Sequence, residues 1–580
     1  MISASSMDLA WCFDQPRVGE VAKRRAHVMG DVMSRPNFDH APPPVRVNGR
    51  LLVPVHVTGL DAMVIFDARS RTAACQARLA YDVGPNTGYP LWDLRQPITH
   101  ASIDGVPIAP SSIPELELGE GPAATLRVIP QSQAAGSAHT LRLRYALGIP
   151  RSDLGGAYPP VLRWSDKGLR WSIGMADLFA GRHLEAWFPS NLPFDQFRFR
   201  LLVKLVGFDA PHVLITNGQA LGVGHNTWSI VFPDWFTSLS QLIELHRADE
   251  VKGVRKTIRL SKARDSVCVE VWKLARVPGD VHRVLKRTAD LIKAIDATYG
   301  PFPGNRYVCF LHGARGGMEY SYAATTSEEA LAHEVLHSWF ARSVSQATDA
   351  DGWWKEAFTT YRTRRRPMAI PFNDSDQPLM LCSRRPFQRT TPREAYTAGA
   401  RFFSGVAHAV GGTYRLDVLM RRLYERRALT PLSTLELEEF LVAESGAVSL
   451  VDAFHRYVYG LDDPKHPPIL CVEGRPALSR APGHDTCLAV RVANHGVETC
   501  KHFMVIFGLP GATRPRPAAV AGGFDLRPGE SRLMSARVVD SSRLPLTTDA
   551  AILRASAHAR RRATPRPERV GTCGCHRIHG

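Results

Sequence analysis

The sequence contains no apolar run as long as the eighteen or so residues that a membrane-spanning helix needs. Its first residues, 1–16, have neither a basic start nor a sustained apolar stretch, so no secretory signal peptide is predicted. Cysteine is scarce, with 10 in 580 residues, and its scattered spacing favours reduced thiols, although Cys471, Cys487 and Cys500 leave one bridge open as an alternative. These absences predict a cytoplasmic protein without a membrane span.

Acidic residues are outnumbered by basic ones, 55 to 72, which gives the chain a formal net charge of +17. No zinc-finger spacing, aromatic RNA-binding signature or helix-turn-helix accompanies this charge, so no specific nucleic-acid partner is predicted. Part of the charge is concentrated in a loop at 362–393, which would border a cleft and attract an acidic substrate or partner. The alternative is a solvated loop without a binding role. The arginines of this loop are Arg362, Arg364, Arg365, Arg366, Arg384, Arg385, Arg389 and Arg393.

Hydrophobic patterning predicts an α+β protein of several domains. Alternating segments at 141–145 and 197–205, separated by glycine and proline turns, are typical of a β-rich domain. Amphipathic patterns at 435–442 and 449–459 predict helices that close a second core. The predicted units are a flexible basic extension at 1–44, a β domain at 45–267, a largely helical domain at 268–460, a small β sandwich at 465–555 and a disordered basic tail at 556–580. In the tail, Cys573 and Cys575 with two histidines fit no usual structural zinc spacing.

The most informative motif is His333-Glu334-Val335-Leu336-His337, followed after eighteen further residues by Glu356. Residues four apart on a helix share a face, so a helix at 331–340 would present His333 and His337 on the same side. Glu356 lies too far along the chain to belong to that helix and must come from the next one. Two imidazoles and one carboxylate can hold one zinc ion with the fourth position open, which is typical of a catalytic site. The alternative is an amphipathic helix whose histidines are merely solvated.

Glu334 follows the first ligand and cannot coordinate together with the histidines, which leaves it in position to act as a general base. A zinc-bound water has a pKa of about 7, so a nearby carboxylate can take its proton at neutral pH. Attack on a carbonyl then produces an oxyanion that needs a second hydrogen-bond donor besides the metal. A tyrosine hydroxyl suits that role.

A predicted buried strand at 307–311 leads into a glycine-rich turn that contains Gly316 and Gly317, followed by Met318 and Glu319. Paired glycines let another backbone approach closely, so this strand edge is predicted to accept an extended peptide. Glu319 offers a carboxylate near the metal that would pair with a substrate ammonium group. The alternative is a glycine turn with a surface glutamate.

Three blocks at 316–320, 333–340 and 353–361 resemble, in residues and in order, the alanyl aminopeptidase family of zinc metallopeptidases (gluzincins), and they are also similar to glycyl aminopeptidases. Weaker similarity at 93–105 and 187–218 looks like the family's N-terminal β domain. The resemblance implies a saddle-like N-terminal β domain and a thermolysin-like catalytic domain. It also implies one Zn²⁺ ion and the removal of N-terminal residues from peptides. Larger members carry a long helical C-terminal domain, for which this chain has no room.

Two tyrosines compete for the role of oxyanion donor. Tyr396 begins the block Tyr-Thr-Ala-Gly-Ala, which looks like the family's Tyr-x-Lys-Gly-Ala block without its lysine, and Tyr414 follows two glycines. The resemblance favours Tyr396, although it follows Glu356 sooner than is usual in the family.

The chain departs from the family pattern close to the ligands. Lys355 stands where the family usually has asparagine, and Ala341-Arg342 stands where it usually has Gly-Asn. Metal ligation should survive both changes. Recognition of a free amino terminus also depends on a second residue that the family places in its N-terminal domain, for which Glu185 is the nearest candidate and a surface glutamate the alternative interpretation.

Two functions follow from these residues. The first is a zinc-dependent peptide hydrolase, an aminopeptidase with His333, His337 and Glu356 as ligands and Glu334 as base. The second is another use of the same site, as a hydrolase of a non-peptide or N-blocked substrate or as a binding or scaffold protein. An intact base beside intact ligands favours the first, because a binding protein needs only the shape of the site.

Overall fold

The computed structural model describes most of the chain between residues 38 and 558. Most of the predicted extension at 1–44 and of the tail at 556–580, with Cys573 and Cys575, lies outside the described residues, as does Arg384. The described ranges are 38–119, 124–156, 158–166, 168–260, 266–373, 377–383, 385–461, 470–479, 486–508, 518–538 and 554–558.

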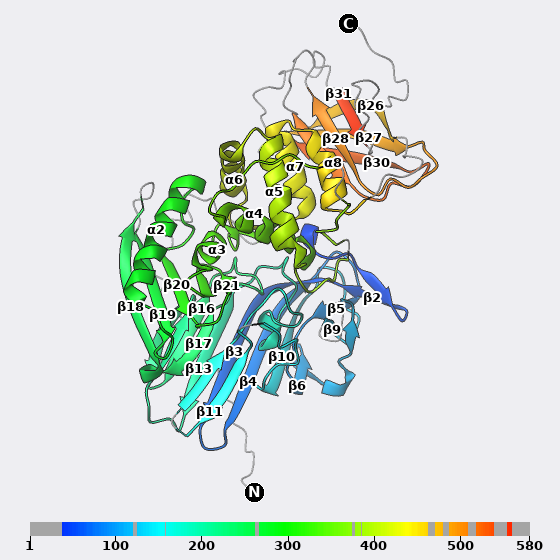
Figure 1. Cartoon of the computed structure of the whole chain (residues 1–580). Helices are drawn as coiled ribbons and strands as arrows, with labels where there is room; N and C mark the ends of the chain where they lie inside the picture. Colours follow the sequence, from blue (N-terminus) through cyan, green and yellow to red (C-terminus); the bar gives the residue numbers. More distant parts are fainter. Residues whose placement is uncertain are drawn as a thin grey trace.

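Three β-sheets form the N-terminal part of the molecule, in the lower half of Figure 1. Their strands are β1 (Val45–Val47), β2 (Arg50–Val53), β3 (Val55–Asp67), β4 (Thr72–Val83), β5 (Tyr89–Trp92), β6 (Ile98–Ile103), β7 (Val106–Ile108), β8 (Glu115–Glu117), β9 (Thr125–Val128), β10 (Ala138–Ala146), β11 (Val161–Ser165), β12 (Gly168–Ser172), β13 (Phe199–Val206), β14 (His212–Thr216), β15 (Gln219–Gly224), β16 (Thr227–Phe232) and β17 (Ile243–Arg247). The largest sheet has the order β15-β16-β13-β3-β4-β10-β6-β7, and the others are β1-β2-β5-β9-β8 and β11-β12-β17-β14. The predicted β-rich N-terminal region is therefore confirmed.

Alternation of side chains along these strands builds the main core of the N-terminal part. On β4, buried residues such as Cys75 and Leu79 alternate with more exposed ones, as expected for a strand with one face covered. Trp171 of β12 and Trp187 lie edge to face in the same core, with ring centroids 5.7 Å apart. This core supports the loops that reach the candidate site.

A five-stranded sheet connects the β-rich part to the helices. Its order is β18 (Val251–Arg259), β19 (Ser266–Leu274), β20 (Arg306–Leu311), β22 (Ala323–Thr326) and β21 (Gly317–Tyr320). In β20, Tyr307, Cys309 and Leu311 belong to the helical core, whereas Val308 and Phe310 belong to the N-terminal core. Burial on both faces explains the uninterrupted apolar run of this strand. The predicted domain boundary at 267/268 falls within β19, whereas the sheet already begins with β18.

The helices lie in the middle of Figure 1, and the first two of them pack against this sheet. They are α2 (Val281–Tyr299), α3 (Leu331–Leu336), α4 (Trp353–Thr363), α5 (Ala400–Ala409), α6 (Thr413–Arg427), α7 (Thr434–Ser445) and α8 (Ser449–Tyr457), with a small sheet of β23 (Phe340–Ala341), β24 (Val344–Gln346) and β25 (Thr430–Leu432). A capping box of Ser433 and Glu436 starts α7, and Gly446, with a φ of 72°, ends it. None of the helices in the described ranges is long and apolar enough to cross a membrane.

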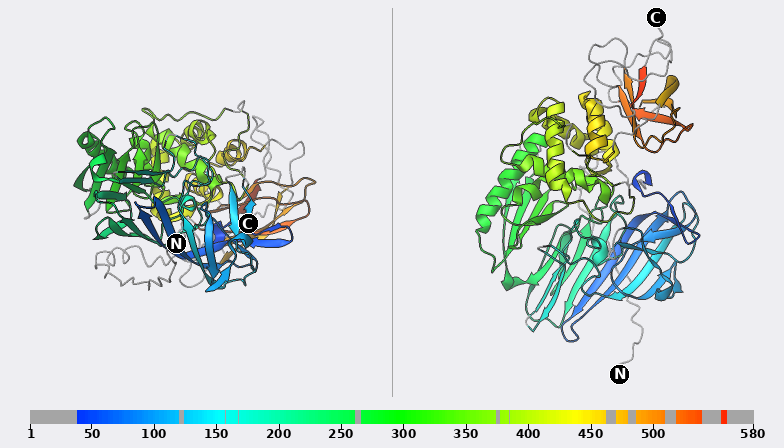
Figure 2. Two further views of the ribbon diagram at one scale, coloured as in Figure 1. Left: turned by 90° about the horizontal axis from the view of Figure 1, so that it is seen from below. Right: turned by 45° about the vertical axis from the view of Figure 1, so that its right-hand side comes forward.

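Two three-stranded sheets follow the last helix and lie beyond α7 and α8 in both Figures 1 and 2. One contains β26 (Leu470–Ser479), β27 (Cys487–Asn494) and β30 (Ser531–Arg537), and the other contains β28 (Phe503–Gly508), β29 (Ala519–Gly523) and β31 (Arg554–His558). Val492 from the first sheet and Phe503 from the second share one core. Cys471 pairs with Ala493 and Cys487 with Ser479, so these two cysteines lie at opposite ends of one hairpin. Their placement gives no support to a bridge between them.

Candidate active site

The three predicted metal ligands converge where two helices meet. His333 lies on α3, His337 caps the C-terminal end of that helix, and Glu356 lies in the first turn of α4. His333 Nε2 is 3.0 Å from His337 Nε2 and 3.1 Å from Glu356 Oε2, and His337 Nε2 is 3.4 Å from Glu356 Oε2. Two bonds of about 2.1 Å at a tetrahedral angle place ligand atoms about 3.4 Å apart, so the triangle fits one zinc ion.

Helix α3 ends earlier than the predicted helix at 331–340, because its last turn tightens. The amides of Ser338 and Trp339 donate to the carbonyls three residues before them. The chain then turns so that the Phe340 carbonyl lies 3.1 Å from His337 Nδ1. A proton on Nδ1 that is donated to this carbonyl leaves Nε2 as the unprotonated nitrogen that coordinates a metal.

The surroundings of the three predicted ligands shift their pKa values in different directions. Burial raises the pKa of the Glu356 carboxyl, but Lys355 and His337 outweigh burial and hold it well below its usual range. Burial lowers the pKa of His333. Burial also lowers the pKa of His337, but Glu356 and Glu319 outweigh it and raise the value to about 9. Glu356 is therefore ionised, as a metal ligand must be, and the carboxylates around His337 favour positive charge at that imidazole.

Glu334 is buried beside the ligands with one carboxyl oxygen without a partner. Among the described residues, Glu334 Oε2 has no hydrogen-bond partner, and burial together with Glu319 and Glu356 raises the pKa of Glu334 well above its usual range. A carboxyl group with raised proton affinity suits a base that must hold and return a proton. Gly317 makes room for it, since a Cβ at this position would lie 2.6 Å from Glu334 Oε1.

The structure places the two candidate tyrosines in different environments. Tyr396 lies in a single π-helical turn, η6 (Ala395–Gly399), and its ring stacks on the imidazole of His333 with centroids 6.1 Å apart. Burial raises the pKa of Tyr396 well above its usual range, so the hydroxyl keeps its proton and can donate it to a hydrogen bond. Tyr414 is 77% exposed on α6. Tyr396 is the tyrosine at the metal ligands.

A cavity of about 760 Å³ opens over this centre. Its lining includes the peptide-binding residues predicted from the glycine-rich block, and β21, which carries three of them, is the edge strand of its sheet among the described strands. The N-terminal part of the chain contributes the opposite wall. The lining includes Tyr158, Met175, Asp177, Phe179, Gly316, Gly317, Met318, Glu319, His333, Glu334, Glu356 and Tyr396.

Sequence reasoning missed Asp177, which the structure brings to the ligands. Asp177 Oδ2 lies 2.6 Å from Lys355 Nζ, across a separation of 178 residues. Lys355 also contacts Glu319 Oε1 at 2.6 Å and Glu356 Oε1 at 2.7 Å. No spacing pattern connects Asp177 to the metal motif, so the sequence carried no signal for it.

Glu185, the predicted second amine-binding residue, lies elsewhere. It is fully buried, and its Oε1 is 2.9 Å from Arg389 Nη2. Arg389 is in turn 3.1 Å from Asp93, so these charges form a buried group instead of lining the cavity. Glu185 therefore matches neither interpretation, because it does not line the cavity as an amine anchor would and is not at the surface.

The arginine-rich loop does not line the cavity with its described arginines. Arg389 is buried, and Arg362 pairs with Asp417 at 2.9 Å. Arg393 lies over the ring of Phe179 at 5.5 Å, which brings it close to the cavity wall. Attraction of an acidic substrate or partner by this loop stays a prediction.

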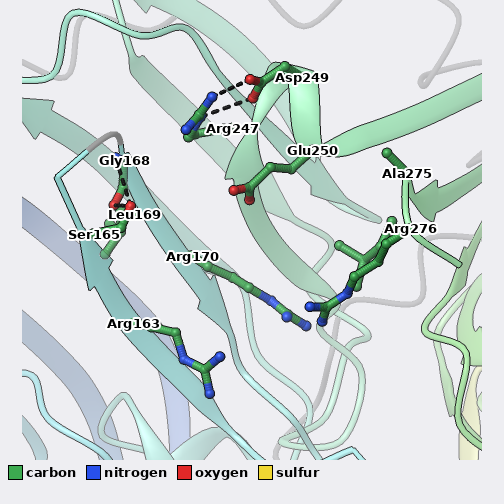
Figure 3. A pocket seen from close by; sticks show the side chains of 11 residues that line it. Arg163, Ser165, Gly168, Leu169, Arg170, Arg247, Asp249, Glu250, Ala275 and Arg276 are labelled. Carbon is green, nitrogen blue, oxygen red and sulfur yellow. Dashed lines mark hydrogen bonds and ion pairs between the residues drawn. The ribbon is translucent and has the colours of Figure 1, made fainter.

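A second cavity, of about 340 Å³, lies away from the metal ligands and shares no lining residue with the first (Figure 3). Arg247 pairs with Asp249 on its rim, while Arg170 and Arg276 extend toward each other across it. Its charged groups partly neutralise one another. None of the predicted site residues lies in its lining.

The sequence matches no protein-family model and no curated protein. Similar solved structures include an M1 zinc metallopeptidase from Deinococcus radiodurans, at 17% identity and a TM-score of 0.53, which covers 71% of this chain and 95% of that one. A mutant from the same organism, bound to a Tyr-Ser-Ala substrate, gives 18% identity, a TM-score of 0.53 and the same coverage. Aminopeptidase A of Legionella pneumophila, in complex with aspartic acid, gives 13% identity and a TM-score of 0.51. The match covers 83% of this chain and 57% of that one. The likeness shows that this chain has the M1 zinc metallopeptidase fold and confirms, at the level of the fold, the resemblance seen in the sequence.

Proposed function

We propose that this chain, with its M1 metallopeptidase fold, is a zinc-dependent peptide hydrolase that removes N-terminal residues from peptides. The observation that carries the proposal is the ligand triangle of His333, His337 and Glu356 with the buried carboxyl group of Glu334 beside it. A structure with the same fold holds a tripeptide substrate, which supports a peptide as the substrate class.

His333, His337 and Glu356 would hold the zinc ion, which when bound would polarise the scissile carbonyl and acidify a water molecule. Glu334 takes a proton from the attacking water and then gives it to the leaving nitrogen. The Tyr396 hydroxyl donates a hydrogen bond to the carbonyl oxygen as negative charge develops there. The edge of β21 binds the peptide backbone as an added strand.

Replacement of Glu334 by glutamine tests the proposal, because glutamine keeps the shape of the side chain but cannot accept the proton. We expect Glu334→Gln to lower kcat by about 10²- to 10⁴-fold. Metal content, measured by atomic emission, should stay at one zinc ion per chain. The control is Glu425→Gln, which changes an exposed glutamate on α6.

The substrate panel contains aminoacyl and N-acylated fluorogenic peptides, so that the result does not depend on one kind of amino terminus. Full turnover by Glu334→Gln would contradict the assigned base. Full zinc occupancy in the wild-type protein without turnover of any peptide would overturn the hydrolase proposal and favour the binding or non-peptide alternative.

A further inference from the structure

The ammonium group of Lys355 is surrounded by three carboxylates. Its Nζ lies 2.6 Å from Asp177 Oδ2, 2.6 Å from Glu319 Oε1 and 2.7 Å from Glu356 Oε1. The side chain is fully buried. An ammonium group has three N–H donors, so these three contacts use all of them.

A second basic residue lies against the same carboxylate. Arg342 Nη2 is 2.9 Å from Glu319 Oε1, and its Nε donates to the Glu319 backbone carbonyl at 3.2 Å. Lys355 and Arg342 are the two basic residues that depart from the resembled pattern near the ligands. Both departures therefore converge on Glu319, the residue predicted to anchor a substrate ammonium.

A peptide with a free amino terminus would need carboxylate acceptors for its own ammonium group. Asp177, Glu319 and Glu356 line the cavity, but each already accepts from Lys355. The other acidic residues of the lining are Glu334, the base, and Glu329, which is exposed. A second ammonium at the same carboxylates would also be repelled by Lys355 and Arg342.

We infer that Lys355 takes the place of a substrate ammonium, so that the site accepts a peptide whose first residue has a neutral, acylated nitrogen and rejects a free amino terminus. This inference rests on the proposed function and names its substrate class. The cavity, of about 760 Å³, has room for the acyl group, and its lining also includes Tyr158, Met175 and Phe179. These side chains offer largely apolar surface.

Matched substrate pairs test the inference on the wild-type protein. Each pair is an aminoacyl fluorogenic amide and its N-acetylated form, over a range of side chains. We expect kcat/KM to be at least about tenfold higher for the N-acetylated member of each pair that is cleaved. A preference for the free amines would overturn the inference while leaving the hydrolase proposal intact.

The acyl group can come from a blocked terminus or from a preceding residue of a longer peptide. Product mapping by mass spectrometry on N-acetylated peptides separates these sources. Release of the acetylated first residue supports a blocked terminus, and internal cuts support a preceding residue. Both results support a neutral nitrogen at this position, and internal cuts would replace the proposed removal of N-terminal residues by internal cleavage.

Lys355→Met removes the internal ammonium and should shift the preference in kcat/KM toward free amines by at least about tenfold. Lys286→Met makes the same change at an exposed position on α2 and should leave the ratio unchanged. An unchanged ratio in a folded Lys355→Met protein would overturn the inference.

Binding gives a readout that needs neither turnover nor a folded Lys355 variant. Calorimetric titration of zinc-loaded Glu334→Gln with amino acids and with N-acetyl amino acids should show tighter binding of the acetylated compounds. Tighter binding of the free amino acids would overturn the inference. If the wild-type protein turned over no substrate but still bound N-acetyl amino acids more tightly than free amino acids, the hydrolase proposal alone would be overturned.

Discussion

Two glycines place the reactive groups of the site. Gly317 permits the carboxyl group of Glu334 to lie against β21, and Gly399 permits η6 to lie against α4, since a Cβ there would come within 2.6 Å of the Ala357 Cβ. Ala357 follows the proposed metal ligand Glu356 on α4. This close approach of η6 and α4 brings Tyr396 beside the ligands, which explains the glycine three residues after the tyrosine.

Tyr396→Phe removes the proposed oxyanion donor and keeps the ring that stacks on His333. We expect kcat to fall by about 10²- to 10³-fold, with KM changed far less, because the hydroxyl acts mainly as charge develops on the carbonyl oxygen. Steady-state kinetics on a cleaved peptide measures both. The matched control, Tyr414→Phe on the exposed side of α6, should keep wild-type rates. Equal rates in the two variants would show that Tyr396 is not the donor.

Local spacing made part of the site predictable. His333, Glu334 and His337 are fixed relative to one another by one helical turn, so the sequence was sufficient to place them together. Asp177 could not be found in this way, because a loop of the β-rich part brings it to Lys355 from 178 residues away. The resemblance suggested Glu185 as the second amine-binding residue of the N-terminal domain, but in the structure a buried arginine pairs with it.

At the scale of elements, Arg389 connects the segment before η6 to the β-rich part through Asp93 and Glu185. Arg389→Met should lower the free energy of unfolding by about 3 to 5 kcal/mol, because it removes a partner from two buried carboxylates. Arg365→Met, at an exposed position of the same arginine-rich loop, should change stability by less than about 0.5 kcal/mol. Urea unfolding followed by tryptophan fluorescence compares them, and equal midpoints would contradict the buried ion pairs.

Helix α7 contacts the C-terminal sheets through, among other contacts, a hydrogen bond in which Gly522 N donates to Glu439 Oε1 at 2.6 Å. Burial raises the pKa of Glu439 to about 8, against an ordinary value near 4.3 in the unfolded chain. The folded state therefore binds more protons between these values, and stability is lost as the pH rises toward about 8.

We expect the free energy of unfolding to fall by about 1 kcal/mol per pH unit between about pH 6 and 7.5 from this group. Glu439→Gln keeps an acceptor for Gly522 N but has no carboxyl group to titrate. The free energy of unfolding of this variant should therefore depend less steeply on pH, by about 1 kcal/mol per pH unit. Glu498→Gln, at an exposed position, should retain the wild-type slope. Urea unfolding at several pH values measures the slopes, and parallel curves for the Glu439 variant would refute the assignment.

Elements with strong patterns were predictable, and their ends were less so. The apolar run at 307–311 identified β20 because burial on both faces needs apolar side chains at every position. Helix α3 ended before Phe340 because the chain turns so that the Phe340 carbonyl faces His337. Helical periodicity in the sequence does not show this turn. The boundary at 267 fell inside β19 because a change in composition does not show where one sheet ends and the next begins.

At the scale of the whole molecule, a zinc ion would link α3 to α4 only in the folded state. Ligands that bind the folded state alone stabilise it, by about 4 kcal/mol at a thousand times their Kd. We expect chelation to lower the melting temperature by several degrees in calorimetry and zinc to restore it. The melting temperature of His333→Ala should be the same with and without chelator. A wild-type protein whose melting temperature also does not change with chelator would contradict the metal site.

Strand β20 has a practical consequence for protein engineering. Val308 and Phe310 are covered by side chains of the β-rich part. An excised helical region would therefore expose this apolar surface to solvent and aggregate. Chimeric proteins that aim to exchange specificity must therefore exchange the β-rich part and the helical part together, since neither part would fold on its own.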